Sequence, residues 1–189
     1  IRTRRGEHTV SVDEQPHKAN IEKIPQLRPA FAEGGTIKPA NSSSISDGAS
    51  ALLLASEDAV ASHGLKARAR IVAHARNSLA PEDFTLAPIG AVEQVLAKAG
   101  WSAAEVDLWE INEAFAMVTM LTTHALDRDS ACVNVHGGAC AQGHPIGSTG
   151  SRIIVTLMHA LEHYGKQRGV AALCIGGGEA TAVAIELVS

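Results

Sequence analysis

The chain has 189 residues, a formal net charge of −4 and 46% hydrophobic residues. This length allows roughly one domain with a sizeable buried core, plus an appendage. The basic residues form no aromatic-interleaved patch, so we expect no nucleic-acid partner. The longest apolar runs, such as residues 153–157, are too short to span a bilayer, so we expect no membrane partner.

The three cysteines are scattered along the chain and odd in number. They make a poor disulfide framework at this length, which predicts a reducing compartment and a cytoplasmic location. The chain begins with Ile1 rather than Met, and Arg2, Arg4 and Arg5 follow. This is no signal-peptide pattern, and we expect the chain to begin inside a longer protein.

Residues 1–40 differ in composition from the rest of the chain. They hold seven Lys or Arg against five Asp or Glu, and four prolines interrupt any long periodic element. The remaining residues hold nine basic and fifteen acidic side chains. The sequence therefore predicts a loop-rich arm over residues 1–40 and an α/β domain over residues 41–189.

Hydrophobic runs and helix caps alternate along the second segment. A run of small apolar residues predicts a buried strand over residues 49–55, and Ser56 is a cap for a short helix that stops at Gly64. Further strands are predicted over residues 69–75, 106–111, 170–175 and 181–187, and helices over residues 57–63, 89–99, 112–126 and 148–163. This order indicates an α/β fold with a mixed sheet covered by helices.

Residues 133–150 contain five glycines and a proline, which predicts a shaped loop rather than an ordinary helix or strand. His144 lies in this loop, Asn112 follows a predicted strand, and Cys174 ends another just before three glycines. Sites gather at the carboxyl ends of strands in α/β sheets, so these three side chains could share one cleft. Taken singly, a buried cysteine or a histidine beside a proline is usually structural.

A metal-binding module is one alternative. His136, Cys140 and His144 are spaced four residues apart, and Cys174 could complete a soft tetrahedral set. That spacing aligns ligands only on a helix, and the glycines and the proline of the loop argue against a helix there. We therefore expect no metal.

Three ordered motifs resemble the carboxy-terminal signatures of thiolases: residues 112–116, residues 137–147 and residues 174–178. Residues 27–31 and 41–48 match the same family in the right order. The resemblance implies the end of the coenzyme A-binding loop domain followed by the carboxy-terminal half of the thiolase fold. It also implies an acyltransferase that forms or cleaves acetoacetyl-CoA by a reversible Claisen condensation.

The resemblance also implies roles for individual residues. Cys174 is similar to the cysteine that takes or returns the α-proton. His144 matches the histidine that activates the nucleophile and holds the enolate oxygen, and Asn112 matches the residue that positions a water in that oxyanion hole. Gly176 matches a backbone donor to the acyl-enzyme oxyanion.

For the substrate, Ser43 matches a residue that bonds the pantetheine arm, and Ala114 and Phe115 match residues that line its pocket. Pro16 stands where some relatives carry an arginine for the nucleotide phosphates. Coenzyme A thioesters are substrates here, so no cofactor is expected. The family is typically dimeric or tetrameric, which implies a homo-oligomer for the complete protein.

The nucleophilic cysteine of thiolases belongs to an amino-terminal half that is absent from this sequence. Cys132 and Cys140 do not replace it, because the family has no reactive group at either position. We therefore expect the isolated chain to be inactive. The alternative interpretation is a catalytically inactive thiolase-fold fragment or an interaction module.

Overall fold

The computed structural model describes residues 1–188, without the side chains of Pro16 and Lys18. The expectation for Pro16, and Ser189 at the end of the predicted second domain, lie outside the described residues. No helix in the described part of the chain is both long enough and apolar enough to cross a lipid bilayer.

A four-stranded mixed sheet forms the centre of the structure. Its strands are β3 (Ala69–Ser78), β4 (Leu108–Ile111), β5 (Arg168–Cys174) and β6 (Glu179–Leu187), in the order β3-β6-β5-β4. β4 and β5 are parallel, whereas β6 is antiparallel to both β3 and β5. The predicted mixed sheet covered by helices is confirmed.

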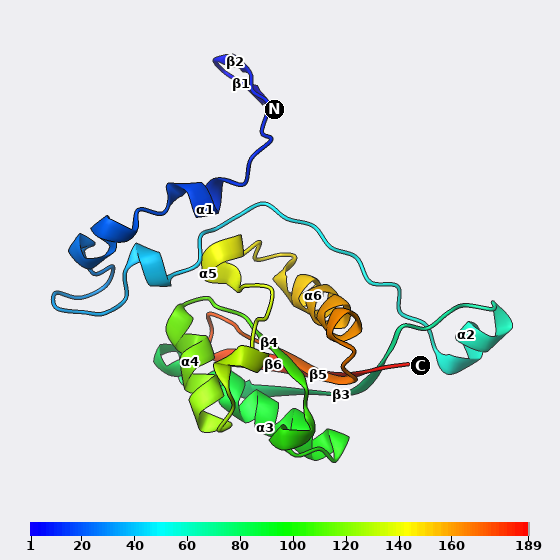
Figure 1. Ribbon diagram of the computed structural model, residues 1–189. Coiled ribbons are helices and arrows are strands. Elements are labelled where there is room, and N and C mark those ends of the chain that lie inside the picture. Colours follow the sequence, from blue (N-terminus) through cyan, green and yellow to red (C-terminus); the bar gives the residue numbers. More distant parts are fainter. Residues whose placement is uncertain (189) are drawn as a thin grey trace.

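Helices cover both faces of the sheet (Figure 1). α3 (Ala87–Ala99) and α4 (Ala116–Ala125) lie on one face, and α6 (Thr149–Tyr164) lies on the other. Two separate hydrophobic clusters result, one beneath α3 and α4 and one beneath α6. All four positions of β4 are buried because both of its faces are covered, so its sequence does not alternate between apolar and polar residues.

Capping residues place the helix ends as predicted. The hydroxyl of Ser56 accepts a hydrogen bond from Ala59 N–H (3.2 Å) at the start of α2 (Glu57–Ser62). Gly100 and Gly165 end α3 and α6 in left-handed conformations. α4 begins at Ala116, later than predicted, because the backbone through Phe115 is still extended.

The predicted buried strand over residues 49–55 is wrong. These residues form neither helix nor strand, and Leu53 and Leu54 are 86% and 71% exposed. The apolar run pairs with no strand of the sheet, and a strand needs such a partner to satisfy its backbone groups. Instead, the segment runs along α6, where Ser50 Oγ lies 2.7 Å from Ser148 Oγ (Figure 1).

The arm has little regular structure. It contains a two-stranded ribbon of β1 (Arg2–Thr3) and β2 (Gly6–Glu7), and the short helix α1 (Glu14–Lys18), which contacts α5 (Ala139–Gln142). The 3₁₀ turns of the chain are Ile21–Gln26, Pro39–Asn41, Pro81–Asp83, Ala103–Glu105 and Ser130–Cys132.

Candidate active site

The glycine-rich loop is fixed to the edge of the sheet at its first residues. Val133 forms a parallel bridge with Trp109, and Asn134 N–H donates to the carbonyl of Trp109 (2.8 Å). The Asn134 side-chain amide then takes the place of a neighbouring strand's backbone: it accepts a hydrogen bond from Ile111 N–H and donates one to Ile111 O, both at 2.9 Å. The loop therefore departs from the end of β4, beside Asn112.

Within the loop, residues 139–142 form the single helical turn α5, which the glycine pattern did not predict. Glu113 stabilises this turn, because its carboxylate accepts a hydrogen bond from Cys140 N–H (3.1 Å) near the start of the helix. Gly138 has no side chain, and a Cβ there would overlap the Glu113 carboxylate. The glycine is thus needed for close approach.

His144 has a defined orientation and protonation pattern. The hydroxyl of Thr149 donates to Pro145 O (3.0 Å), so its oxygen accepts from Nδ1–H of His144 (2.7 Å). This arrangement leaves Nε2 with a lone pair. Burial lowers the pKa of His144, and the positive charge of Arg152 lowers it further, which favours the neutral ring.

Asn112 and His144 lie together, as predicted. Asn112 is 1% exposed and follows β4, and its N–H donates to Ala172 O of β5 (2.9 Å). Its Nδ2 lies 3.5 Å from His144 Nε2, at the long end of the hydrogen-bond range. Its Oδ1 is buried with no hydrogen-bond partner among the described residues, so it can accept from a further donor.

Cys174 occupies the end of β5, the strand next to Asn112. It is 7% exposed, and burial raises the pKa of its thiol above the ordinary value. No hydrogen bond joins its thiol to Asn112 or His144 in the part of the chain that the structure describes. Gly176 lies in the exposed turn that follows, and its backbone N–H has no acceptor among the described residues.

The three predicted substrate-contact residues also lie together. Ser43 donates both its backbone N–H and its hydroxyl to the carbonyl of Ala114, each at 3.1 Å. The preceding Ser42 forms an antiparallel bridge with Phe115, and the Phe115 ring packs edge-on against Phe31 at 5.8 Å between centroids. Residues 42–44 reach His144 as well, because His144 N–H donates to Ser44 O (2.8 Å).

The histidines and cysteines do not assemble a metal site. Among residues 1–188 as described, no three His, Cys, Asp or Glu side chains are placed to hold a metal ion. The exposed His136 packs instead against the ring of Tyr164. Burial raises the pKa of the Cys140 thiol to about 12, and Glu113 adds to the effect, so this thiol stays protonated.

Several polar residues around the loop were missed by sequence reasoning: Glu110, Glu113, Gln142, Thr149 and Arg152. One signal was present, since Glu110 is the only charged residue of the buried strand β4. A charge in a buried strand marks an unusual environment. The other four look like ordinary loop and helix residues until the fold brings them together.

The structure is a layered α/β domain in which Asn112, at the end of β4, lies beside His144 of the glycine-rich loop. The chain belongs to the thiolase family. The family's description "Thiolase, C-terminal domain" matches residues 65–187, and "Thiolase, N-terminal domain" matches residues 1–58.

Named relatives and solved structures agree with this assignment. The chain is 49% identical to a probable acetyl-CoA acetyltransferase of Dictyostelium discoideum, covering 92% of this chain and 42% of that protein. It is 44% identical to the cytosolic acetyl-CoA acetyltransferase of Mus musculus, covering 98% and 48%. The chain thus spans about half the length of these relatives.

Among solved structures, the acetyl-CoA acetyltransferase of Bacillus anthracis superposes with a TM-score of 0.91 at 40% identity, covering 100% of this chain and 48% of that one. A human mitochondrial 3-ketoacyl-CoA thiolase in complex with CoA gives a TM-score of 0.83 at 37% identity, covering 90% and 43%. These similarities confirm the expected thiolase fold.

Proposed function

We propose that this chain supplies the acid/base and oxyanion half of a thiolase site, in a protein that interconverts acetyl-CoA and acetoacetyl-CoA. The observation that carries the proposal is the set of contacts that links Asn112, His144 and Thr149 at the end of β4. It rests on family membership for the reaction class and on the geometry for the individual roles.

In this proposal His144 is the base that activates the nucleophilic cysteine of the amino-terminal half. The Thr149 hydroxyl accepts from Nδ1–H, so the lone pair that can take a proton is that of Nε2, which has only a long 3.5 Å contact with Asn112 Nδ2. The lowered pKa of His144 favours this neutral form. Once protonated, the same nitrogen can donate a hydrogen bond to the enolate oxygen of the second substrate.

Asn112 fits the role of holding a water beside that oxygen. Its buried Oδ1 has no partner among the described residues, and a water that donates to Oδ1 could use its second hydrogen for the enolate oxygen. The unpaired N–H of Gly176 would serve the acyl-enzyme oxyanion separately. Two distinct donor sets therefore suit the two oxygens that become charged.

Cys174 is assigned the proton transfer at the α-carbon. A thiol whose pKa is raised by burial is protonated at neutral pH. In thiolysis this thiol gives its proton to the α-carbon as acetyl-CoA leaves, and the resulting thiolate takes the proton of the incoming coenzyme A thiol. In condensation the same steps run in reverse.

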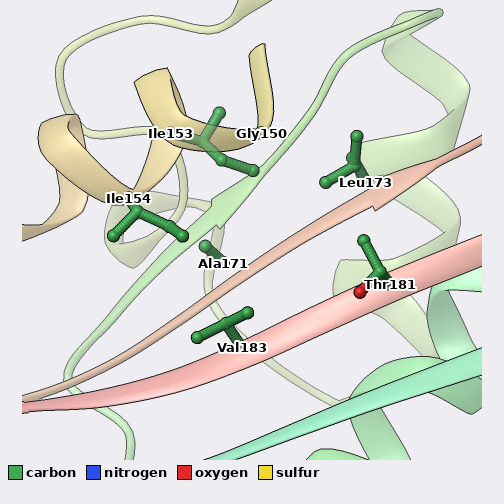
Figure 2. Close-up of a pocket in the computed structure, with 7 residues that line it drawn as sticks. All are labelled: Gly150, Ile153, Ile154, Ala171, Leu173, Thr181 and Val183. Carbon is green, nitrogen blue, oxygen red and sulfur yellow. The ribbon is translucent and has the colours of Figure 1, made fainter. Parts of the chain in front are cut away.

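Two apolar surfaces fit contacts with the rest of the protein. One is the exposed pair Leu53 and Leu54. The other is a shallow pocket of about 140 Å³ between α6 and strands β5 and β6, shown in Figure 2 and lined by Gly150, Ile153, Ile154, Ala171, Leu173, Thr181 and Val183. Because the chain is about half as long as its relatives, we assign both surfaces to contacts with the missing amino-terminal half.

The proposal includes coenzyme A thioesters as substrates, with Ser43, Ala114 and Phe115 at the pantetheine arm. A CoA-bound thiolase with the same fold supports this part. A homo-oligomer for the complete protein, and a cytoplasmic location like that of the cytosolic mouse relative, belong to the proposal too. The mitochondrial human thiolase shows that the fold serves another compartment as well.

The test uses Cys174→Ala in the complete protein, with Cys140→Ala as the matched control. Incubation with acetyl-CoA should still acetylate the Cys174→Ala variant, as measured by intact mass, because the nucleophile lies elsewhere. Condensation and thiolysis should be abolished, whereas Cys140→Ala should keep nearly full activity. Condensation by Cys174→Ala within about tenfold of the unmodified protein would refute the assignment. The 189-residue chain alone should show no thiolysis.

A further inference from the structure

A cluster of ionisable side chains, one buried and two half-buried, lies beside the loop that carries His144. It consists of Glu110 on β4, Glu113 just after β4, and Arg152 in the first turn of α6. Glu110 is 2% exposed, and neither its Oε1 nor Nε of Arg152 has a hydrogen-bond partner among the described residues. Because burying a carboxyl group and leaving a guanidinium nitrogen without a partner are both costly, stability alone does not account for this cluster.

Resting on the proposed function, we propose that Arg152 is a positioning residue for the thiolase reaction. It holds the loop of residues 136–144 through Gln142, and it places a positive charge beside His144.

The mechanical part of the proposal follows from a chain of hydrogen bonds. Arg152 Nη1 donates to Oε1 of Gln142 (3.3 Å). The amide nitrogen of Gln142 then donates to two backbone carbonyls at the start of the loop, His136 O (2.7 Å) and Gly137 O (3.0 Å). The Gln142 side chain therefore joins the end of α5 to the residues that precede α5, and Arg152 of α6 holds that side chain in place.

Glu113 holds the same loop through Cys140 N–H. Burial lowers the pKa of Arg152, and the carboxyl groups of Glu110 and Glu113 partly offset that effect. Glu113 thus bonds the loop at Cys140, and Arg152 bonds it at Gln142. Removing the cation leaves Gln142 without its donor and leaves Glu113 without a nearby counter-charge.

The electrostatic part concerns His144 directly. Arg152 of α6 is the charged group that lowers the pKa of the His144 ring. Glu110 and Glu113 act on the pKa of Arg152, and Cys140 on α5 carries a protonated thiol. A nearby positive charge disfavours the imidazolium form. Arg152 therefore helps to keep the ring a base at neutral pH.

The experiment compares Arg152→Gln, Arg152→Lys and Gln142→Leu in the complete protein. For each variant, NMR of ¹³C-labelled histidine follows the titration of His144, whose signal is identified by its loss in His144→Asn. In Arg152→Gln we expect His144 to titrate at higher pH and kcat of thiolysis to fall by about tenfold or more, since small displacements of a reacting group have effects of this size. Arg152→Lys should restore the titration and most of kcat.

Gln142→Leu removes the hydrogen bonds and leaves the buried charges in place. It should lower kcat with little change in KM and with no change in the His144 titration. A double variant, Arg152→Gln with Glu110→Gln, replaces both ionisable groups by neutral amides and serves if Arg152→Gln does not fold. It should show the same upward shift in the titration.

An Arg152→Gln protein whose His144 titration and kcat both match the unmodified protein would overturn the proposal. So would an Arg152→Lys protein with the same defects as Arg152→Gln. The NMR titration needs no turnover. If the unmodified protein lacks thiolysis, the proposed function fails, while the titration still decides the role of Arg152.

Discussion

Replacing Glu110 by Gln should change how the stability of the chain depends on pH. Burial raises the pKa of this carboxyl from 4.5 to about 8; Arg152 lowers it and Glu113 raises it by smaller amounts. The folded-state pKa lies above the unfolded-state value, so the folded chain binds the extra proton between these two pH values. The resulting stability is fully present below about pH 4.5 and is lost as pH rises through about 8.

The magnitude follows from that difference. Between pH 5 and pH 8, linkage with these two pKa values costs the native chain about 3 to 4 kcal/mol of unfolding free energy. Gln resembles the protonated carboxyl and does not titrate. The stability of Glu110→Gln relative to the unmodified chain should therefore improve by about that amount between pH 5 and pH 8.

Urea denaturation at the two pH values measures this change, with the combined fluorescence of Trp101 and Trp109 as the probe. Glu93→Gln is the matched control, because it removes one exposed carboxylate from α3. An unchanged difference between Glu110→Gln and the unmodified chain at pH 5 and pH 8 would refute the reasoning. Glu110 would then be ionised in the folded chain and fully compensated by Arg152.

Two further predictions concern the loop itself. Gly138→Ala places a methyl group where the Glu113 carboxylate lies, so it should destabilise the protein by about 1 to 3 kcal/mol in thermal or chemical unfolding, whereas an unaltered midpoint would show that the carboxylate moves freely. Thr149→Val removes the acceptor of His144 Nδ1–H and should lower kcat of thiolysis by about tenfold or more, while Thr149→Ser, which keeps the hydroxyl, should retain it. Equal kcat values for the Val and Ser variants would contradict the proposed orientation of His144.

Local signals predicted the secondary structure well where capping and periodicity agreed. The cap at Ser56 and the glycines after α3 and α6 marked helix ends that the structure confirms. The same local logic failed for residues 49–55, because a strand depends on a partner that local sequence does not specify. The glycine-rich loop also concealed α5, whose single turn depends on a hydrogen bond to Glu113, a residue 27 positions away from its donor Cys140.

The candidate site shows the same division. The positions of polar residues at predicted strand ends and at the glycine-rich loop predicted that Asn112 and His144 share one cleft. The structure confirms that these two side chains are close. Cys174 lies at the end of the neighbouring strand, and among the described residues its thiol has no hydrogen bond to Asn112 or His144. The catalytic role of Cys174 therefore stays a prediction. Thr149 and Arg152 were missed because neither carries a motif of its own.

By itself, the sequence determined the class of fold, the ends of most helices and the residue types with chemistry near strand ends. These features depend on short-range rules of capping, periodicity and backbone freedom. Only the tertiary structure decided which nitrogen of His144 is free, that Glu110 is a buried acid, and that Arg152 reaches the loop through Gln142. Those properties depend on distance, burial and shared hydrogen bonds between distant segments, which no local pattern encodes.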